Sequence, residues 1–348
     1  MTSVYLSERQ RSAIKTLPKV ELHLHFEGCI QPESIEALAR SIDQPMIRRT
    51  QDLYSFKDLE EFLSTLDWIC NLVGSEHEIT TLSQSLVNYL RGQNIVCAEI
   101  IINPSHWRLS LDSLLPPILA EFARAESQFG ITLGLLPSVG RHQKNADAMQ
   151  LLDWCVSNSH PNLRGFSIDG SERGGSRTDQ FVSAFKKAKE SGLGITAHAG
   201  ESSGPQGVVA ALDQLGVDRL DHGVRASEDL ALMNRLAADG IPLNVCVSSN
   251  CHNLYSSFDQ HPLPQLLAKG LICTVNTDDP AMLDIDLSSE LVAVANAYDL
   301  SLGALKQLQL NAVGAAFCPI DDKARLAKQI ENEWSLSLIH ISEPTRRT

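Results

Sequence analysis

Residues 163–198 have the sequence LRGFSIDGSERGGSRTDQFVSAFKKAKESGLGITAH, in which two short apolar runs flank an amphipathic stretch. The runs Leu163–Asp169 and Gly194–His198 have the length and apolar content of buried strands, and Asp179–Glu190 between them has helical periodicity. A strand, a helix and a second strand in this order form a βαβ unit, in which the two strands are parallel. The stretch therefore predicts one unit of a parallel α/β sheet.

Similar runs occur three times before this unit and three times after it. They are Val20–Phe26, Ile95–Asn103, Ile131–Val139, Arg219–His222, Pro242–Val247 and Leu271–Asn276. Amphipathic stretches at Ala146–Asn158 and Glu228–Ala238 supply further crossover helices. Eight consecutive units predict an α/β fold of the TIM-barrel class, a (β/α)8 barrel.

The chain has 348 residues, so it exceeds a typical barrel of ~250 residues by roughly a hundred. Much of the excess lies between the first and second predicted strands, where we expect a helical insertion around Phe56–Leu72 that caps the barrel mouth. Extra C-terminal helices are expected after the last strand, at Ser288–Tyr298, Leu302–Val313 and Asp322–Ile330. Because no linker or internal repeat interrupts the pattern, we expect residues 1–334 to form a single domain.

The last segment, Ser335–Thr348, differs from the rest of the chain. It has neither the periodicity of an amphipathic helix nor an obvious partner strand. We therefore expect residues 335–348 to be a disordered or foreign tail that the fold does not need.

The composition favours a small molecule as the partner. With 29 basic and 42 acidic residues the net charge is −13, and no Lys/Arg run forms the basic patch that nucleic acid or an anionic membrane requires. The sequence has neither a signal peptide nor an apolar stretch of ~20 residues, so we expect a cytoplasmic protein. The oligomeric state does not follow from the sequence.

Ionisable residues stand at the C-terminal ends of four predicted strands. His23 and His25 lie two residues apart in the first strand and project to the same face, towards the barrel interior. The fifth strand ends at His198 and the sixth at His222, and Asp278 follows the eighth. Each residue alone is more often structural. Polar groups gathered at one buried rim, however, are poorly solvated unless a cation holds them together.

Three imidazoles and one carboxylate make an open catalytic zinc site. We favour four ligands for one zinc ion per chain, namely His23, His25, His198 and Asp278. This choice leaves Glu201 and His222 for acid/base chemistry. In metal-assisted hydrolysis the cation lowers the pKa of water to about 7, His222 takes or orients the proton of that water, and a protonated Glu201 donates to the substrate. No Walker loop or GxGxxG motif is present, which disfavours phosphoryl transfer and dinucleotide binding.

Four motifs occur in order along the chain: His23-Leu-His25, His198-Ala-Gly-Glu201, Asp221-His222-Gly223 and Asn276-Thr-Asp278-Asp279-Pro280. Together they resemble the adenosine deaminase family of zinc aminohydrolases, over roughly residues 15–333. The resemblance implies the barrel, the zinc ligands above and a purine nucleoside or base as substrate. It also implies that Glu201 protonates purine N1, that His222 assists the attacking hydroxide, and that Asp279 and the backbone of Gly170 bind the purine ring. His25 and Glu27 would also lie beside the substrate.

Within the family, the resemblance implies deamination of adenosine or deoxyadenosine, with adenine and aminodeoxyfutalosine as alternatives. Glu27 stands where adenosine-specific relatives usually carry Asp near the sugar, and Ser171 replaces the Asp of their usual Gly-Asp-Glu. Both departures favour adenine or another N6-amino purine. Glu27 either binds a ribose hydroxyl or marks a pocket too short for a sugar, and its charge argues against a 5′-phosphate.

Two other classes of protein stay open. A metal-dependent phosphoesterase or another amidohydrolase would share the barrel and the HxH strand, but it would leave the Thr277-Asp278-Asp279-Pro280 motif and the loop ending at Glu201 unexplained. A non-catalytic purine-binding protein would not need the complete set of ligands together with Glu201.

Overall fold

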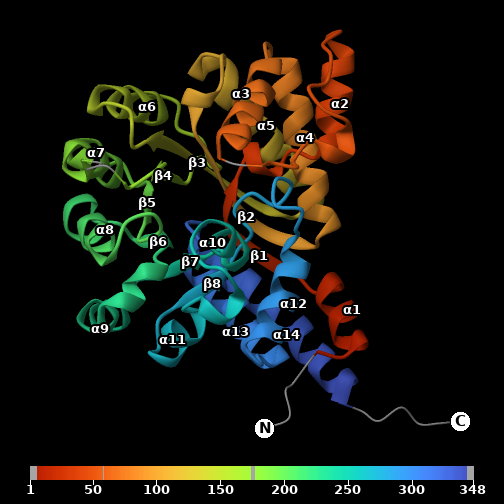
Figure 1. The fold of residues 1–348 in the computed structure, drawn as a ribbon, viewed down its shortest axis with the longest axis vertical. Helices are drawn as coiled ribbons and strands as arrows, with labels where there is room; N and C mark the ends of the chain where they lie inside the picture. The colour runs from red at the N-terminus through yellow and green to blue at the C-terminus, as the bar shows by residue number, and fades with distance from the viewer. Residues whose placement is uncertain (1–5, 58, 174–176, 343–348) are drawn as a thin grey trace, which may run out of the picture.

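The structure is a computed structural model that describes residues 6–57, 59–173 and 177–342. Within these residues, eight strands follow one another around a parallel sheet in the order of the chain (Figure 1). They are β1 Lys19–His25, β2 Ile95–Ile102, β3 Thr132–Gly140, β4 Gly165–Asp169, β5 Gly194–Ala199, β6 Arg219–His222, β7 Leu243–Val245 and β8 Cys273–Val275. A parallel bridge between Leu24 and Asp278 joins β1 to the segment after β8. The predicted (β/α)8 barrel is confirmed.

The helices surround the strands (Figure 1). They are α1 Glu8–Thr16, α2 Pro32–Ser41, α3 Leu59–Leu72, α4 Glu76–Gly92, α5 Leu111–Phe129, α6 Asn145–Ser157, α7 Val182–Glu190, α8 Pro205–Ala210, α9 Leu230–Asp239, α10 Val247–Asn253, α11 Leu263–Ala268, α12 Leu287–Ala297, α13 Leu302–Ala315 and α14 Ile320–Ser342. The predicted insertion between β1 and β2 is helical and holds α2, α3 and α4. In the described part of the chain, no helix has the length and apolar character needed to cross a membrane.

The two faces of β1 explain how the fold positions its polar residues. Leu22 and Leu24 are fully buried in the hydrophobic core. Glu21, His23 and His25 alternate with them and project from the opposite face of the strand. Strands of a parallel barrel are covered on both sides, so even these polar residues are largely removed from solvent.

The last two strands are shorter than predicted. β7 ends at Val245 because the chain turns into α10 at Val247, and β8 ends at Val275. The residues beyond β8 are instead held by side-chain hydrogen bonds: Asn276 Oδ1 accepts from Leu22 N at 2.8 Å. The apolar content of these two segments therefore predicted longer strands than β7 and β8 form.

The expectation that Ser335–Thr348 lacks a helix is wrong for residues 335–342, which continue α14 to Ser342. Trp334, just before this segment, is buried, and its Nε1 donates to Pro18 O at 2.9 Å. A helix that is already nucleated extends at low cost, so the weak periodicity of the segment did not end it. Residues 343–348 lie outside the described residues.

Candidate active site

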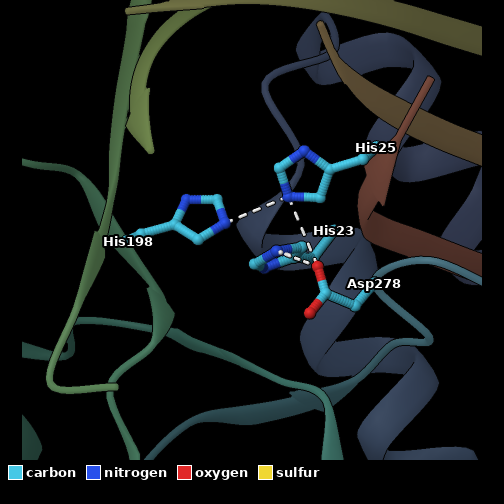
Figure 2. A group of neighbouring side chains, drawn as sticks. All are labelled: His23, His25, His198 and Asp278. Atoms are coloured by element: carbon cyan, nitrogen blue, oxygen red, sulfur yellow. Dashed lines mark hydrogen bonds and ion pairs between the residues drawn. The ribbon is translucent and has the colours of Figure 1, made fainter. Parts of the chain in front are cut away.

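Three imidazole nitrogens and a carboxylate oxygen converge where the barrel strands end (Figure 2). His23 and His25 come from β1 and His198 from β5, and Asp278 follows β8. His23 Nε2 lies 3.0 Å and His25 Nε2 lies 3.3 Å from Asp278 Oδ1. His25 Nε2 lies 3.0 Å from His198 Nε2. The structure thus brings together all four residues predicted as metal ligands.

The spacing and chemistry of this cluster fit a zinc ion. Tetrahedral zinc with bonds of about 2.0–2.1 Å places its ligand atoms ~3.3 Å apart, close to the distances observed. His23 Nε2 is buried and lies beside Asp278 Oδ1 without making a hydrogen bond. Burial, together with the neighbouring His23 and His25, lowers the pKa of His198 well below its usual value. Its imidazole is therefore neutral and offers a lone pair.

Asp221 lies beside the outer nitrogens of two of these imidazoles. Its Oδ1 is 3.5 Å from His23 Nδ1 and its Oδ2 is 3.9 Å from His198 Nδ1. Asn244 Nδ2 holds the carboxylate by donating to Oδ1 at 2.9 Å. A carboxylate on this side of a histidine favours the tautomer that leaves Nε2 free for a metal. Asn244 was not predicted, because nothing in its sequence neighbourhood shows that it reaches Asp221.

Glu201 and His222 lie next to the four-residue cluster. His222 Nε2 is 3.8 Å from Glu201 Oε2 and 3.9 Å from Asp278 Oδ2. Burial and the charges of Asp278 and Glu172 raise the pKa of Glu201 to about 7, whereas burial lowers the pKa of His222. A carboxyl group that titrates near neutrality beside a neutral imidazole is typical of acid/base sites.

The backbone is strained at two of these residues. His222 and Asp278 have φ angles of 65° and 71°, in the left-handed region that residues other than glycine seldom adopt. His222 is the last residue of β6, and Asp278 lies three residues beyond the end of β8. Strain of this kind costs about 1–3 kcal/mol and persists where a side chain must be aimed.

Glu172 fixes the turn that carries Glu201. Its Oε1 accepts from Gly200 N at 3.0 Å and from Ser203 Oγ at 2.7 Å. Its Oε2 accepts from Glu201 N at 2.9 Å and from Ser203 N at 3.2 Å. In the sequence, Glu172 is distinguished only as the last residue of Gly170-Ser171-Glu172. The loop after β4 thus holds the loop after β5.

The two residues expected to bind the purine ring lie in loops at the same rim. An added Cβ at Gly28 would come within 1.9 Å of Asp279 Oδ1, so the Asp279 carboxylate rests against a backbone that must be glycine. Burial and the charge of Asp278 raise the pKa of Asp279 to about 7. Gly170 follows β4 directly, is exposed, and has a φ of 83°.

The carboxylate of Glu27 accepts hydrogen bonds from two residues that follow β2. Its Oε1 accepts from Trp107 Nε1 at 2.8 Å and from Asn103 N at 3.3 Å, and the residue is buried. The Trp107 ring packs edge-on against Phe26, with centroids 5.7 Å apart. Neither Trp107 nor Asn103 was predicted, because a single tryptophan or asparagine carries no motif.

A parallel barrel with three histidines and an aspartate at the C-terminal ends of its strands has the ligand set and the location typical of a metal-dependent hydrolase site. The chain belongs to the adenosine deaminase family, since the profile described as Adenosine deaminase matches residues 18–333. It is 33% identical to an adenine deaminase of Ralstonia pickettii over 340 residues, covering 94% of this chain and 98% of that protein.

Two solved structures share the fold over nearly their whole length. An adenine deaminase from Arthrobacter aurescens superposes with a TM-score of 0.86 at 29% identity, covering 92% of this chain and 100% of the other. An amidohydrolase from Burkholderia ambifaria with bound zinc superposes with a TM-score of 0.90 at 25% identity, covering 98% of this chain and 97% of the other.

Proposed function

We propose that the chain is a zinc-dependent purine aminohydrolase that converts adenine and water to hypoxanthine and ammonia. The observation that carries this proposal is the convergence of the four candidate ligands on one point, with Glu201 and His222 beside it. The relatives named adenine deaminase support the choice of reaction.

Zinc bound by the four candidate ligands would supply a Lewis acid that activates water. Attack of the water oxygen on C6 of the purine interrupts ring aromaticity and places negative charge on N1. Glu201 relieves this charge by giving N1 a proton, and its raised pKa allows it to hold that proton near pH 7. His222 Nε2 faces the same space and contacts the attacking oxygen. The C6 amino group then takes the proton of the hydroxyl group on C6 and leaves as ammonia, which gives the 6-oxo ring of hypoxanthine.

Asp279 and the backbone of Gly170 hold the purine ring in this proposal. A carboxyl group with a pKa near 7 can donate a hydrogen bond to a bare ring nitrogen or accept one from a ring N–H. Gly170 presents its backbone without a side chain in the way, so a flat ring can approach closely.

Adenine is favoured over adenosine because the Glu27 carboxylate already has partners. A ribose hydroxyl would have to compete with the indole N–H of Trp107 for Glu27 Oε1. Burial also raises the pKa of Glu27 and so disfavours a free anion at this position. The wall formed by Glu27, Trp107 and Phe26 therefore suits a substrate that ends at the base.

The direct test measures ammonia release by the zinc-loaded protein from adenine, adenosine, deoxyadenosine and aminodeoxyfutalosine. We expect kcat/KM for adenine to exceed that for adenosine by about 10² or more, the discrimination that a few kcal/mol in a pocket provides. A preference for a nucleoside would overturn the choice of adenine. Release of phosphate from phosphoesters without ammonia release would place the chain in a different reaction class.

Glu27→Ala tests the closed wall. We expect the ratio of adenine to adenosine turnover to fall at least ~10-fold, because the variant opens the side on which a sugar would lie. Glu33→Ala, which removes an exposed carboxylate on the nearby helix α2, is the matched control and should leave the ratio unchanged. If Glu27→Ala weakens adenosine turnover more than adenine turnover, the carboxylate serves a ribose instead.

A further inference from the structure

A chain of buried polar groups connects a backbone amide to the ring of His222. Leu263 N donates to His261 Nδ1 at 3.1 Å, His261 Nε2 lies 3.2 Å from Asn250 Oδ1, and Asn250 Nδ2 lies 3.1 Å from His222 Nδ1. Asn250, His261 and His222 are 0%, 2% and 1% exposed. Solvent therefore does not supply alternative partners along this chain.

The first link of the chain has a fixed direction. A backbone N–H only donates, so His261 Nδ1, which faces Leu263 N, must be the bare nitrogen of the ring. Burial and the neighbouring His222 lower the pKa of His261 to about 4, so the ring is neutral and carries its single proton on Nε2. His261 therefore donates to Asn250.

The direction passes on through the amide. Because the Asn250 oxygen accepts from His261, the Asn250 NH₂ group faces His222 and donates to Nδ1. A neutral His222 whose Nδ1 accepts a hydrogen bond carries its proton on Nε2. That nitrogen is the one that faces Glu201 and Asp278, at 3.8 and 3.9 Å.

We propose that Asn250 and His261 are positioning residues that keep the proton of His222 on Nε2, so that His222 orients the attacking oxygen by donating a hydrogen bond and does not remove its proton. The role in orienting the oxygen rests on the proposed deaminase function, whereas the tautomer does not. The proton lost by the attacking water passes to the carboxylate of Glu201 and from there to N1 of the purine. Glu201 lies beside the same nitrogen of His222, so it is within reach of that water.

The opposite arrangement is blocked at each link. A basic His222 needs a bare Nε2 and a proton on Nδ1, which would point at the Asn250 NH₂ group. Turning the amide over would direct that NH₂ group at the Nε2–H of His261. Moving the proton of His261 to Nδ1 would then oppose the N–H of Leu263, which cannot be reversed. Each change leaves two buried donors facing each other.

Nitrogen NMR of the full-length, zinc-loaded protein labelled with ¹⁵N-histidine tests the tautomer directly. A protonated ring nitrogen and a bare one give well-separated resonances, and loss of one set in His222→Gln assigns the ring. We expect Nε2 protonated and Nδ1 bare in the unsubstituted protein. The reverse assignment would overturn the inference whether or not the variants below fold.

Kinetics of Asn250→Asp test whether turnover depends on the proton at His222 Nε2. The carboxylate keeps the acceptor for His261 but replaces the donor to His222 with a second acceptor, which draws the His222 proton to Nδ1. We expect kcat for adenine to fall at least ~10-fold with zinc content and KM within about twofold of the unsubstituted protein. A general base would be strengthened by such a carboxylate, as in a Ser-His-Asp triad, so a retained or raised kcat would overturn the inference.

His261→Phe removes the first link, and we expect a smaller loss of kcat, ~3–10-fold, because Asn250 can then turn over. The matched control is His160→Phe. His160 Nδ1 accepts from Asn162 N at 3.2 Å, the same local contact, but it precedes β4 at the other end of the barrel. Its kcat should be unchanged, and an equal fall in both variants would overturn the assignment of His261.

An inactive unsubstituted protein with the Nε2–H tautomer would refute the deaminase proposal alone, and an active one with the Nδ1–H tautomer would refute this inference alone.

Discussion

Both ends of the barrel interior bury charged or ionisable side chains, but the two ends treat them differently. At the N-terminal ends of the strands, Lys19 Nζ donates to Ile14 O at 2.9 Å and to Leu17 O at 2.8 Å. Arg219 Nη1 lies 2.5 Å from Glu99 Oε2, and both side chains are fully buried. Each cation there has its compensation within the chain.

At the C-terminal ends of the strands, the candidate metal-ligand atoms face one another. His25 Nε2 and His198 Nε2 are 3.0 Å apart, and both ring nitrogens of His23 are buried without a hydrogen-bond partner. Arg219 Nε is also buried without a hydrogen-bond partner, but the charge of the guanidinium is paired by the Glu99 carboxylate. The comparison teaches that buried charge which the chain pairs itself serves stability, whereas a cluster of buried lone pairs marks the place for an ion and for chemistry.

The largest expected effect comes from removing one of the candidate metal ligands. His23→Ala and His198→Ala should each lower zinc affinity by more than the ~10–100-fold that loss of an outer-shell partner costs, and turnover should fall with zinc content. Metal analysis after chelator competition measures the loss, with about one zinc per chain expected in the unsubstituted protein. His160→Ala, at the other end of the barrel, should retain its zinc. Full retention in both cluster variants would mean that zinc binds elsewhere.

Glu201→Gln should separate chemistry from metal binding at the same end. The amide keeps the shape of the side chain but lacks a transferable acidic proton, so kcat should fall by about 10²–10⁴ while zinc is retained. Zinc content and kcat are measured on the same preparation. An active, zinc-loaded Glu201→Gln protein would remove this carboxyl group from the mechanism.

Arg219→Met tests the N-terminal end of the barrel, where the buried charges are paired. Removing one member of a buried ion pair leaves Glu99 uncompensated, which should lower the free energy of unfolding by about 3–5 kcal/mol. Zinc content and kcat per folded molecule should not change, because Arg219 donates its other hydrogen bonds to the backbone oxygens of Ala315 and Leu22 and not to the candidate ligands. Denaturant unfolding and turnover of the refolded fraction measure the two quantities. A loss of kcat without a loss of stability would reverse the comparison.

Glu172→Gln should have an intermediate effect. One acceptor oxygen becomes a donor that faces two of the four groups now held, so the turn carrying Glu201 should shift. A displacement of about 1 Å can cost up to ~10²-fold in rate, and we expect a fall of about 10–100-fold in kcat. In a Glu201→Gln background the same change should cost little more, because Glu172 acts through Glu201.

Glu126→Gln is the control for Glu172→Gln. Glu126 Oε1 likewise accepts from a backbone amide, Leu133 N, at 2.9 Å, and from Arg164 Nη2 at 2.9 Å, at the N-terminal end of the barrel. Its kcat should be unchanged. Full additivity of Glu172→Gln and Glu201→Gln would show that Glu172 acts by another route.

The sequence predicted the barrel and the candidate metal ligands because both depend on local patterns. His23 and His25 lie two apart in one strand, and His198 and Asp278 stand where other strands end. The residues that hold the site were not predicted, because each acts on a distant segment. Glu172 binds the turn after β5, and Asn250 connects His261 to His222, pairings that only the closed barrel creates.

The C-terminal segment shows the opposite error, since its weak periodicity was considered without the helix that precedes it. A chain ending at Trp334 keeps the indole bound to Pro18 O and loses the 3.3 Å hydrogen bond from Lys306 Nζ to Ser335 Oγ. Such a bond contributes ~0.5–1.5 kcal/mol at most, so the Tm should change by no more than about 2–4 °C and kcat should stay the same.

A chain ending at Glu333 also loses the buried indole, which should cost about 3–5 kcal/mol. Thermal unfolding of the two truncated proteins measures the difference. Equal melting would show that the indole does not mark the boundary of the fold, and strong destabilisation of both would show that residues 335–342 pack as part of it.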